Sequence, residues 1–425
     1  MKNRVLIALM LILSFTCTQS QDIQYARYLI DSLCSPAFFG RGYTNQGDTK
    51  AAAFIANEFA KIKLAKFQDS YLQEYHLSTN TFSKEMSVAI NKKELITGID
   101  YMVSLSSPSI KGKYKIFKID SSNVTCKADI DKILKKNLKN KIVLIDKQNI
   151  NDKEVIAFGA TLKRKNPFQS KGIAFINDDK LSWGASDGKK QNDFVKINLL
   201  RKSLPAKIKK ISISIEADYL KDYATQNVVG YVKGKLYPDS FYVFTAHYDH
   251  LGQMGKNVYF SGANDNASGT AMVIDLARYF TSDSTLPNYS IVFALVSGEE
   301  TGLYGSYYLA NHPLFPLEKI KFLINLDMVG TGSEGITIVN GSKFKEQYNR
   351  LNDINKEKSY LKTVVERGES CNSDHCAFYE KGVPSIFIYA MGGEFREYHN
   401  LYDLPQKLPL TKYNEIFKLL VDYIF

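Results

Sequence analysis

The chain has 425 residues, of which 44% are hydrophobic and 23% charged, and it carries a formal net charge of +11 at pH 7. This length and composition fit two globular domains, or one large domain with an insertion, and exclude a chain that is disordered as a whole. Five Cys in such a length exclude a disulfide-dense mini-protein, and a single long apolar run excludes a polytopic membrane protein.

Residues 1–20 have the pattern of a secretory signal peptide. Two basic residues precede an apolar run at 5–15, which is too short to cross a bilayer, and small residues at 18 and 20 provide a cleavage site. An uncleaved anchor and a lipid-modified Cys17 both fit the flanking residues less well. We therefore expect export to a secreted or periplasmic location, with no membrane span after cleavage.

Residues 21–83 predict two helices, at 25–33 and 48–64, because their apolar residues recur near the helical period. Residues 84–217 differ, because they are Lys-rich, lack His and contain short strand-like runs. These runs lie at 86–90, 141–145, 172–177 and 211–215. The stretch predicts a smaller β-rich inserted domain. Its lysines lack interleaved aromatic residues and a recognition helix, which favours a solvated surface and no binding of nucleic acid.

Strand-like and helical runs alternate after residue 226. The expected strands are 227–232, 241–246, 290–296, 321–326, 336–339 and 385–389, and the expected helices are 267–280, 303–310, 374–381 and 410–424. This alternation predicts an α/β domain, made of residues 21–83 and 218–425, with a mostly parallel central sheet flanked by helices. Ligands of such sheets bind at the carboxyl ends of the strands.

Potential metal ligands stand at these strand ends. Singly, each has a structural explanation, such as a helix cap for Asp265 or a solvated Glu-Glu pair. Together, imidazoles and carboxylates at successive strand ends indicate a site for two Zn²⁺ ions that share one carboxylate. We expect His247, Asp265 and Asp327 to bind one ion, and Asp265, Glu300 and His399 to bind the other.

Two further residues have expected catalytic roles. Glu299 is adjacent to a ligand and points elsewhere, which suits a general base that takes a proton from water. Asp249 lies two residues after His247, so both side chains point the same way on an extended segment. We expect the Asp249 carboxylate to accept the second ring N–H of His247 and fix its tautomer.

The motifs that carry these residues resemble those of the M28 family of zinc aminopeptidases. They are HYDHLG at 247–252, GANDNASG at 262–269, GEETGLYGS at 298–306, NLDMVG at 325–330, SDH at 373–375 and Tyr398-His399. The N-terminal run at 33–64 is similar to the family's lead-in, and 84–217 is similar to a protease-associated (PA) insert through KIVL at 141–144 and GIAF at 172–175.

The resemblance implies a zinc-exopeptidase-like fold, two zinc ions per chain and a cis peptide after Asp265. It implies an exopeptidase that removes N-terminal residues from peptides with a free N-terminus, with a bridging hydroxide as the nucleophile. One departure concerns 369–372, which read Glu-Ser-Cys-Asn where some members have a Tyr that bonds the oxyanion. The oxyanion donor is therefore unassigned.

Other interpretations stay open at this point. A glutaminyl cyclase-like enzyme on the same fold would bind one zinc ion, and a non-catalytic ectodomain would use the fold as a binding scaffold. The full ligand set, with His250 after Asp249, favours the peptidase. Cys371 and Cys376 suit a small-loop disulfide or two free thiols equally well. No feature indicates an oligomeric state.

Overall fold

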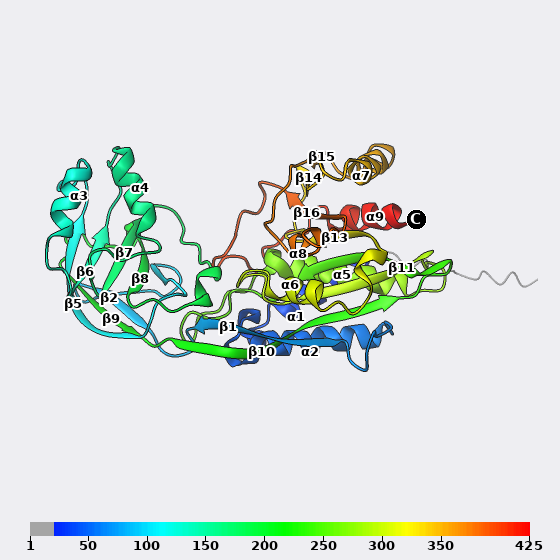
Figure 1. The fold of residues 1–425 in the computed structure, drawn as a ribbon, viewed down its shortest axis with the longest axis horizontal. Helices are drawn as coiled ribbons and strands as arrows, with labels where there is room; N and C mark the ends of the chain where they lie inside the picture. Colours follow the sequence, from blue (N-terminus) through cyan, green and yellow to red (C-terminus); the bar gives the residue numbers. More distant parts are fainter. Residues whose placement is uncertain (1–20) are drawn as a thin grey trace, which may run out of the picture.

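The computed structural model describes residues 21–425, apart from the side chains of residues 186 and 187, so the predicted signal peptide lies outside it. The chain forms two lobes, each built around an eight-stranded sheet (Figure 1). The larger lobe is built from residues that precede and follow the smaller lobe in the sequence. The smaller lobe is therefore an insertion between two strands of the larger one. Within the described residues, no helix is both long enough and apolar enough to cross a membrane.

The sheet of the larger lobe has the strand order β1-β10-β12-β11-β13-β16-β14-β15. Its strands are β1 (Leu72–Thr81), β10 (Asp218–Val232), β11 (Tyr237–His247), β12 (Tyr289–Val296), β13 (Ile320–Leu326), β14 (Gly335–Val339), β15 (Val364–Glu366) and β16 (Ser385–Met391). The four central strands β12, β11, β13 and β16 are parallel, and the segments that pair with one another are largely buried, as the expected α/β domain requires.

Helices cover this sheet. They are α1 (Ile23–Leu33), α2 (Gly47–Lys61), α5 (Gly269–Phe280), α6 (Tyr304–Asn311), α7 (Lys345–Lys358), α8 (His375–Tyr379) and α9 (Tyr413–Ile424). Helix α5 packs against β11, β12 and β13 on one side and against α1 and α9 on the other, so most of its residues are buried. The N-terminus of α1 is capped by Asp22, whose carboxylate accepts the N–H groups of residues 24 and 25.

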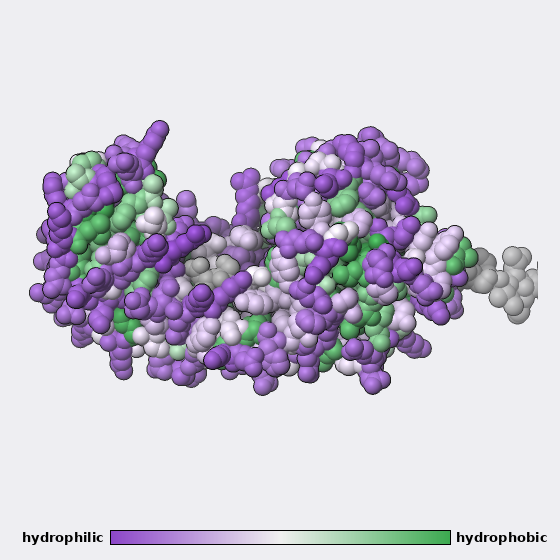
Figure 2. Space-filling model, in the orientation of Figure 1, coloured by the Kyte–Doolittle hydropathy of each residue, from purple (hydrophilic) through white to green (hydrophobic). Residues whose placement is uncertain are grey.

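The smaller lobe is built from residues 87–215 in the strand order β3-β2-β9-β5-β6-β7-β8-β4. Its elements are β2 (Ser87–Ile90), β3 (Lys93–Leu95), β4 (Tyr101–Val103), β5 (Ile110–Ile119), α3 (Lys127–Leu134), β6 (Lys141–Ile145), α4 (Lys153–Thr161), β7 (Gly172–Asn177), β8 (Val195–Leu200) and β9 (Lys210–Ile215). Strands β5 to β8 are parallel neighbours, with α3 and α4 on one face. On the face shown in Figure 2, hydrophilic residues surround a smaller group of hydrophobic residues on this lobe.

Short helical turns complete the chain and include Pro36–Arg41, Thr44–Gln46, Ala263–Ser268, Arg201–Ser203 and Leu317–Lys319. The first of these turns places Arg41 in the interior of the larger lobe, where the side chain is fully buried. The Arg41 guanidinium donates to the backbone carbonyls of Leu33 (3.0 Å), Tyr248 (2.7 Å), Ser261 (2.6 Å) and Gly262 (2.8 Å). Arg41 therefore joins the N-terminal segment to the two loops that follow β11.

We predict that Arg41→Met lowers the free energy of unfolding by at least about 3 kcal/mol, because it leaves four buried carbonyls without a donor, and hydrogen bonds to a charged group contribute roughly 1.5–3 kcal/mol each. Urea denaturation of both proteins measures the change. Arg164→Met is the matched control, because Arg164 is exposed in the smaller lobe. Equal stability of the Arg41 and Arg164 variants would contradict the assigned role of Arg41.

Candidate metal centre

The predicted ligands lie at the carboxyl edge of the central parallel strands. His247 is the last residue of β11, Asp327 directly follows β13, and Glu300 lies in the turn after β12. These three strands end at one edge because they are parallel neighbours in the sheet order. Asp265 comes from the turn that precedes α5, and His399 comes from the loop after β16.

The structure brings these five side chains together. His247 Nε2 lies 3.3 Å from Asp265 Oδ1 and 3.5 Å from Asp327 Oδ1. His399 Nε2 lies 2.9 Å from Asp265 Oδ2 and 3.2 Å from Glu300 Oε2. The site thus has two halves, each with one imidazole and one carboxylate of its own. The two oxygens of Asp265 face opposite halves, as a carboxylate shared between two ions would.

Glu299 lies in the half of the site that contains His247. Ligand atoms of Glu299, His247 and Asp327 all lie within 4.8 Å of one another. Glu299 also lines an open cavity of about 230 Å³. The other residues that line this cavity are Asp265, Asp327, Met328, Arg367, Asn372, Phe387, Tyr389, Tyr398 and His399. A molecule that enters the cavity therefore meets Glu299 beside the cluster.

The structure differs from the sequence expectation at Asp249. His247 Nδ1 is bonded to the main-chain oxygen of Asp249 at 3.1 Å, whereas the Asp249 carboxylate is 3.7 Å away. That carboxylate instead accepts the main-chain N–H of Glu299 and the hydroxyl of Tyr43, both at 3.3 Å. Asp249 therefore holds the His247 ring through its backbone and the Glu299 turn through its side chain.

Two residues that were not predicted to be part of the site support it. His250 Nδ1 lies 2.7 Å from Glu300 Oε1, on the side away from His399. The Asp403 carboxylate accepts the main-chain N–H groups of Asn264 (2.8 Å) and Asp265 (3.1 Å). Both lie within four residues of a predicted ligand, and His250 also belongs to the HYDHLG motif.

The turn that carries Asp265 is fixed from several directions. The peptide bond between Asp265 and Asn266 is cis, as the family resemblance implied. The Asn266 amide donates to the carbonyl of Leu326 at 2.9 Å and accepts the N–H of Met328 at 3.2 Å. Asn266 therefore ties the Asp265 turn to the two residues that flank Asp327.

Residues after β15 support Asp327. The Ser373 hydroxyl donates to Asp327 Oδ2 at 3.0 Å. Cys371 and Cys376, whose state the sequence left open, form a disulfide that encloses Ser373. In the described chain, Cys34 is a buried free thiol and Cys126 an exposed one.

Buried carboxylates outnumber the imidazoles that could neutralise them. The Asp327 and Glu299 carboxylates raise the pKa of His247 well above its usual value, although burial opposes this. Burial lowers the pKa of His399 and the Glu300 carboxylate raises it. The net result is a rise of the pKa to about 11. Burial together with neighbouring carboxylates raises the pKa of Glu299 well above its usual value. The protein charges therefore leave an excess of negative potential that added cations would neutralise.

The donor set fits a pair of zinc ions. His247 Nε2 and Asp327 Oδ1 are both buried and have no hydrogen-bond partner among the described residues, although they face each other across 3.5 Å. Buried polar atoms seldom lack a partner, so a ring nitrogen and a carboxylate oxygen that face each other in this way indicate a site for a metal ion. Imidazole and carboxylate ligands around a shared carboxylate are ligand types that Zn²⁺ accepts.

The smaller lobe contacts the loop that carries His399. The main-chain N–H of Trp183 donates to the His399 carbonyl at 2.8 Å. Lys180 Nζ lies 2.6 Å from Glu397 Oε1 and 2.8 Å from Oε2. The Trp183 ring packs against Phe260 of the larger lobe, with 4.8 Å between the centroids. The segment between β7 and β8 therefore packs against the loop that carries His399, beside the candidate metal centre.

A family model, described as Peptidase family M28, matches residues 227–424. Residues 227–424 are therefore similar to peptidase family M28, as the sequence motifs predicted. Curated relatives of the M28 region include aminopeptidase YwaD of Bacillus subtilis, which is 32% identical over 43% of this chain and 39% of its own length. A probable zinc metalloprotease of Pyricularia oryzae is 41% identical over 26% of this chain and 22% of its own length. The matched region thus spans well under half of the length of each of these two relatives.

Solved structures extend the likeness to both lobes. BSAP, a zinc aminopeptidase from Bacillus subtilis, superposes with a TM-score of 0.71 at 19% identity, over 96% of this chain and 95% of its own. An aminopeptidase from Aneurinibacillus sp. strain AM-1 gives a TM-score of 0.66 at 19% identity, over 96% and 94%. At this identity the comparison establishes the shared fold. The expected fold class, with the M28 region on a parallel sheet, is confirmed.

Proposed function

We propose that the chain is an exported aminopeptidase that uses two zinc ions to remove N-terminal residues from peptides. The observation that carries the proposal is the shared position of Asp265, whose two carboxylate oxygens lie 3.3 Å from His247 Nε2 and 2.9 Å from His399 Nε2. The M28 match and the aminopeptidases among the relatives support the reaction class. Export rests on the composition of residues 1–20.

Five residues would hold the metal pair: His247, Asp265, Glu300, Asp327 and His399. Zinc bound there would polarise the scissile carbonyl and make water nucleophilic at neutral pH. The chain's own contribution to the proton transfer is Glu299, which we assign as general base because it lines the cavity beside the cluster and is not among the expected ligands. The main-chain N–H of Glu299 donates to the Asp249 carboxylate, and this bond holds the turn that carries Glu299 in place.

The cavity fits the N-terminal end of a peptide. Its lining includes the carboxylate of Glu299, which is not among the expected zinc ligands and can accept a hydrogen bond from a protonated α-amine. Aromatic side chains in the same lining, including Phe387 and Tyr389, offer apolar surface to the first side chain of the substrate. An N-acetylated peptide would lose the amine contact, so a free N-terminus is the expected requirement.

A panel of aminoacyl fluorogenic amides tests the activity. We expect hydrolysis that a chelator abolishes and that zinc restores, with no release from N-acetylated counterparts. Cleavage of blocked peptides at internal bonds would replace the aminopeptidase proposal with an endopeptidase. Sequencing the N-terminus of the mature protein tests export, and an intact Met1 in protein from the native host would contradict it.

We predict that Asp403→Asn weakens zinc binding by roughly 10–100-fold, as loss of outer hydrogen bonds to metal ligands generally does. The reason is that an amide offers one acceptor oxygen where the carboxylate accepts the N–H groups of Asn264 and Asp265 with two. Competition with a zinc-binding dye measures the affinity. Asp422→Asn is the control, because Asp422 lies on α9, away from the site, and accepts a hydrogen bond from the Tyr360 hydroxyl. Unchanged affinity in Asp403→Asn would show that the turn does not depend on this carboxylate.

A further inference from the structure

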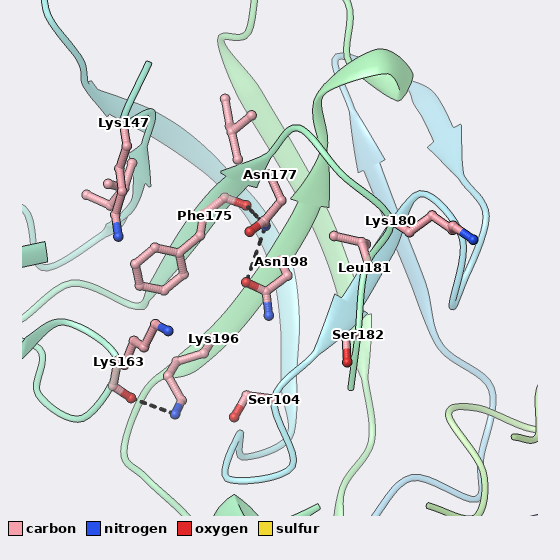
Figure 3. Close-up of a pocket in the computed structure, with 12 residues that line it drawn as sticks. Ser104, Lys147, Lys163, Phe175, Asn177, Lys180, Leu181, Ser182, Lys196 and Asn198 are labelled. Atoms are coloured by element: carbon pink, nitrogen blue, oxygen red, sulfur yellow. Dashed lines mark hydrogen bonds between the residues drawn. The ribbon is translucent and has the colours of Figure 1, made fainter. Parts of the chain in front are cut away.

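A second cavity, of about 430 Å³, lies in the smaller lobe (Figure 3). Four lysines line it, Lys147, Lys163, Lys180 and Lys196, and no Asp or Glu is among the lining residues whose side chains the structure describes. The remaining lining residues are Ser104, Ile145, Phe175, Ile176, Asn177, Leu181, Ser182 and Asn198. The cavity thus combines lysines with amides and an apolar floor, and among the lysines Lys180 is paired with Glu397.

The cavity exists because helices cover only part of the sheet. Phe175 and Asn177 of β7 point to the same face as Lys196 and Asn198 of β8, since alternate residues of a strand share a face. Helix α4 packs beside β6 and ends at Thr161, and no α-helix lies between β7 and β8. The face over β7 and β8 is therefore left open, with Lys147 and Lys163 at its margin.

Two of the lysines face each other without acidic partners. Lys147 and Lys163 make no ion pair with any residue whose side chain the structure describes. Partial burial and the charge of Lys163 lower the pKa of Lys147. Like charges held close in this way destabilise each other, and an anion between them would remove the repulsion. The lysines therefore favour an anionic ligand.

Amide groups provide directional hydrogen bonds in the same cavity. Asn177 donates to Asn198 Oδ1 at 3.4 Å, and Lys196 Nζ donates to the main-chain oxygen of Lys163 at 2.8 Å. Asn198 Nδ2 remains a donor without a partner among the described residues. A carboxylate suits this set, because its two oxygens accept from an ammonium group and an amide N–H together.

The segment that lines this cavity also contacts the loop of the candidate metal centre. Lys180, Leu181 and Ser182 line the cavity, and the next residue, Trp183, donates its N–H to the His399 carbonyl. Lys180 also pairs with Glu397, two residues before His399. Residues 180–183 therefore lie between the lysine-lined cavity and the loop that carries His399. A peptide whose N-terminus is bound at the metal centre would have the cavity beyond this segment.

We propose that this cavity binds a carboxylate of a peptide, with the apolar floor of Ile145, Phe175 and Leu181 receiving a neighbouring side chain. The carboxylate can come from the C-terminus or from an acidic side chain. The identification of the peptide as a substrate rests on the proposed aminopeptidase function. Binding in the cavity does not, and it can be measured without turnover.

Trp183 makes the measurement direct. It is the single Trp of the chain, it is 3% exposed, and it follows the lining residues Leu181 and Ser182. Its intrinsic fluorescence is titrated with three N-acetylated alanine peptides, which an aminopeptidase leaves intact. The first has a free C-terminus, the second has two internal Glu and an amidated C-terminus, and the third is neutral and amidated. We expect a saturable change with the first or the second, which identifies the source of the carboxylate, and none with the third.

Variants complete the test. Lys147→Met with Lys163→Met is expected to weaken binding of the anionic peptide at least about tenfold, because each charged hydrogen bond contributes roughly 1.5–3 kcal/mol. Lys207→Met with Lys209→Met is the matched control; it removes the same charge from the same lobe outside the cavity, and it should bind as the wild type does. Equal weakening in both double variants, or equal changes with all three peptides, would overturn the proposal.

Two further outcomes are informative. Inorganic phosphate that binds at the cavity while neither anionic peptide does would overturn the assignment to a peptide carboxylate. Hydrolysis of a neutral aminoacyl amide by the wild-type protein is measured separately. If that hydrolysis fails while the titration succeeds, the proposed activity is wrong and the cavity stands; the reverse pattern overturns the cavity alone.

Discussion

Glu299→Gln is expected to lower turnover of an aminoacyl amide by about 10²–10⁴-fold, the usual contribution of a general base. The amide keeps the size of the side chain but cannot accept a proton at neutral pH. Glu299 is not among the five expected ligands, so the variant should bind as much zinc as the wild type. Steady-state kinetics and elemental analysis on the same preparation measure both quantities.

Two controls make this result specific. Glu318→Gln alters an exposed carboxylate near the start of β13 and should leave turnover unchanged. Glu300→Gln should instead lose zinc together with activity, because Glu300 Oε2 lies 3.2 Å from His399 Nε2 within the cluster. Turnover of Glu299→Gln within threefold of the wild type would refute its role as the base.

Removal of zinc is expected to abolish hydrolysis and to destabilise the larger lobe. Asp265, Glu300 and Asp327 are all buried, and without cations they repel one another. An ion present at 100 to 1000 times its dissociation constant stabilises the fold by about 2.7–4.1 kcal/mol. Thermal unfolding with and without a chelator should show a lower Tm for the apo-protein, which added zinc restores.

The same experiment has an internal control in the other lobe. The smaller lobe has its own hydrophobic cores around β5 to β9, so its unfolding should respond less to the chelator. A Tm that is identical in the presence and absence of the chelator, in protein shown to have lost its zinc, would contradict a structural contribution of the ions.

Much of the larger lobe could be predicted from the sequence because its central strands are short buried apolar runs. The runs ending before His247, Glu299 and Asp327 were expected as strands and are β11, β12 and β13. Parallel strands place their carboxyl ends at one edge, so residues far apart in the chain could be assigned to one site. The structure brings them together, and their ligand roles remain proposals.

Elements without an apolar period were missed. Helix α7 buries only Leu351 and Asn355 and is otherwise polar, so nothing in its sequence distinguished it from a loop. The exposed half of β10 gave no strand signal for the same reason, whereas β5 alternates Lys with apolar residues at the strand period and was overlooked. Such elements form because tertiary contacts outweigh local preference.

Fine geometry at the site was equally out of reach. The spacing of His247 and Asp249 predicted a bond between their side chains, but the chain turns after β11 and presents the main-chain oxygen of Asp249 instead. His250 and Asp403 act through contacts that depend on this turn and on the loop after β16. The contact between Trp183 and the His399 carbonyl joins two lobes, and no pattern within either one encodes it.

The number of zinc ions per chain tests the central claim most directly. Elemental analysis of protein saturated with zinc and freed of excess is predicted to give two ions for the wild type and at most one for Asp265→Ala, because both halves of the site share this carboxylate. A single ion in the wild type would favour a cyclase-like enzyme, and an unchanged count in Asp265→Ala would contradict the shared site.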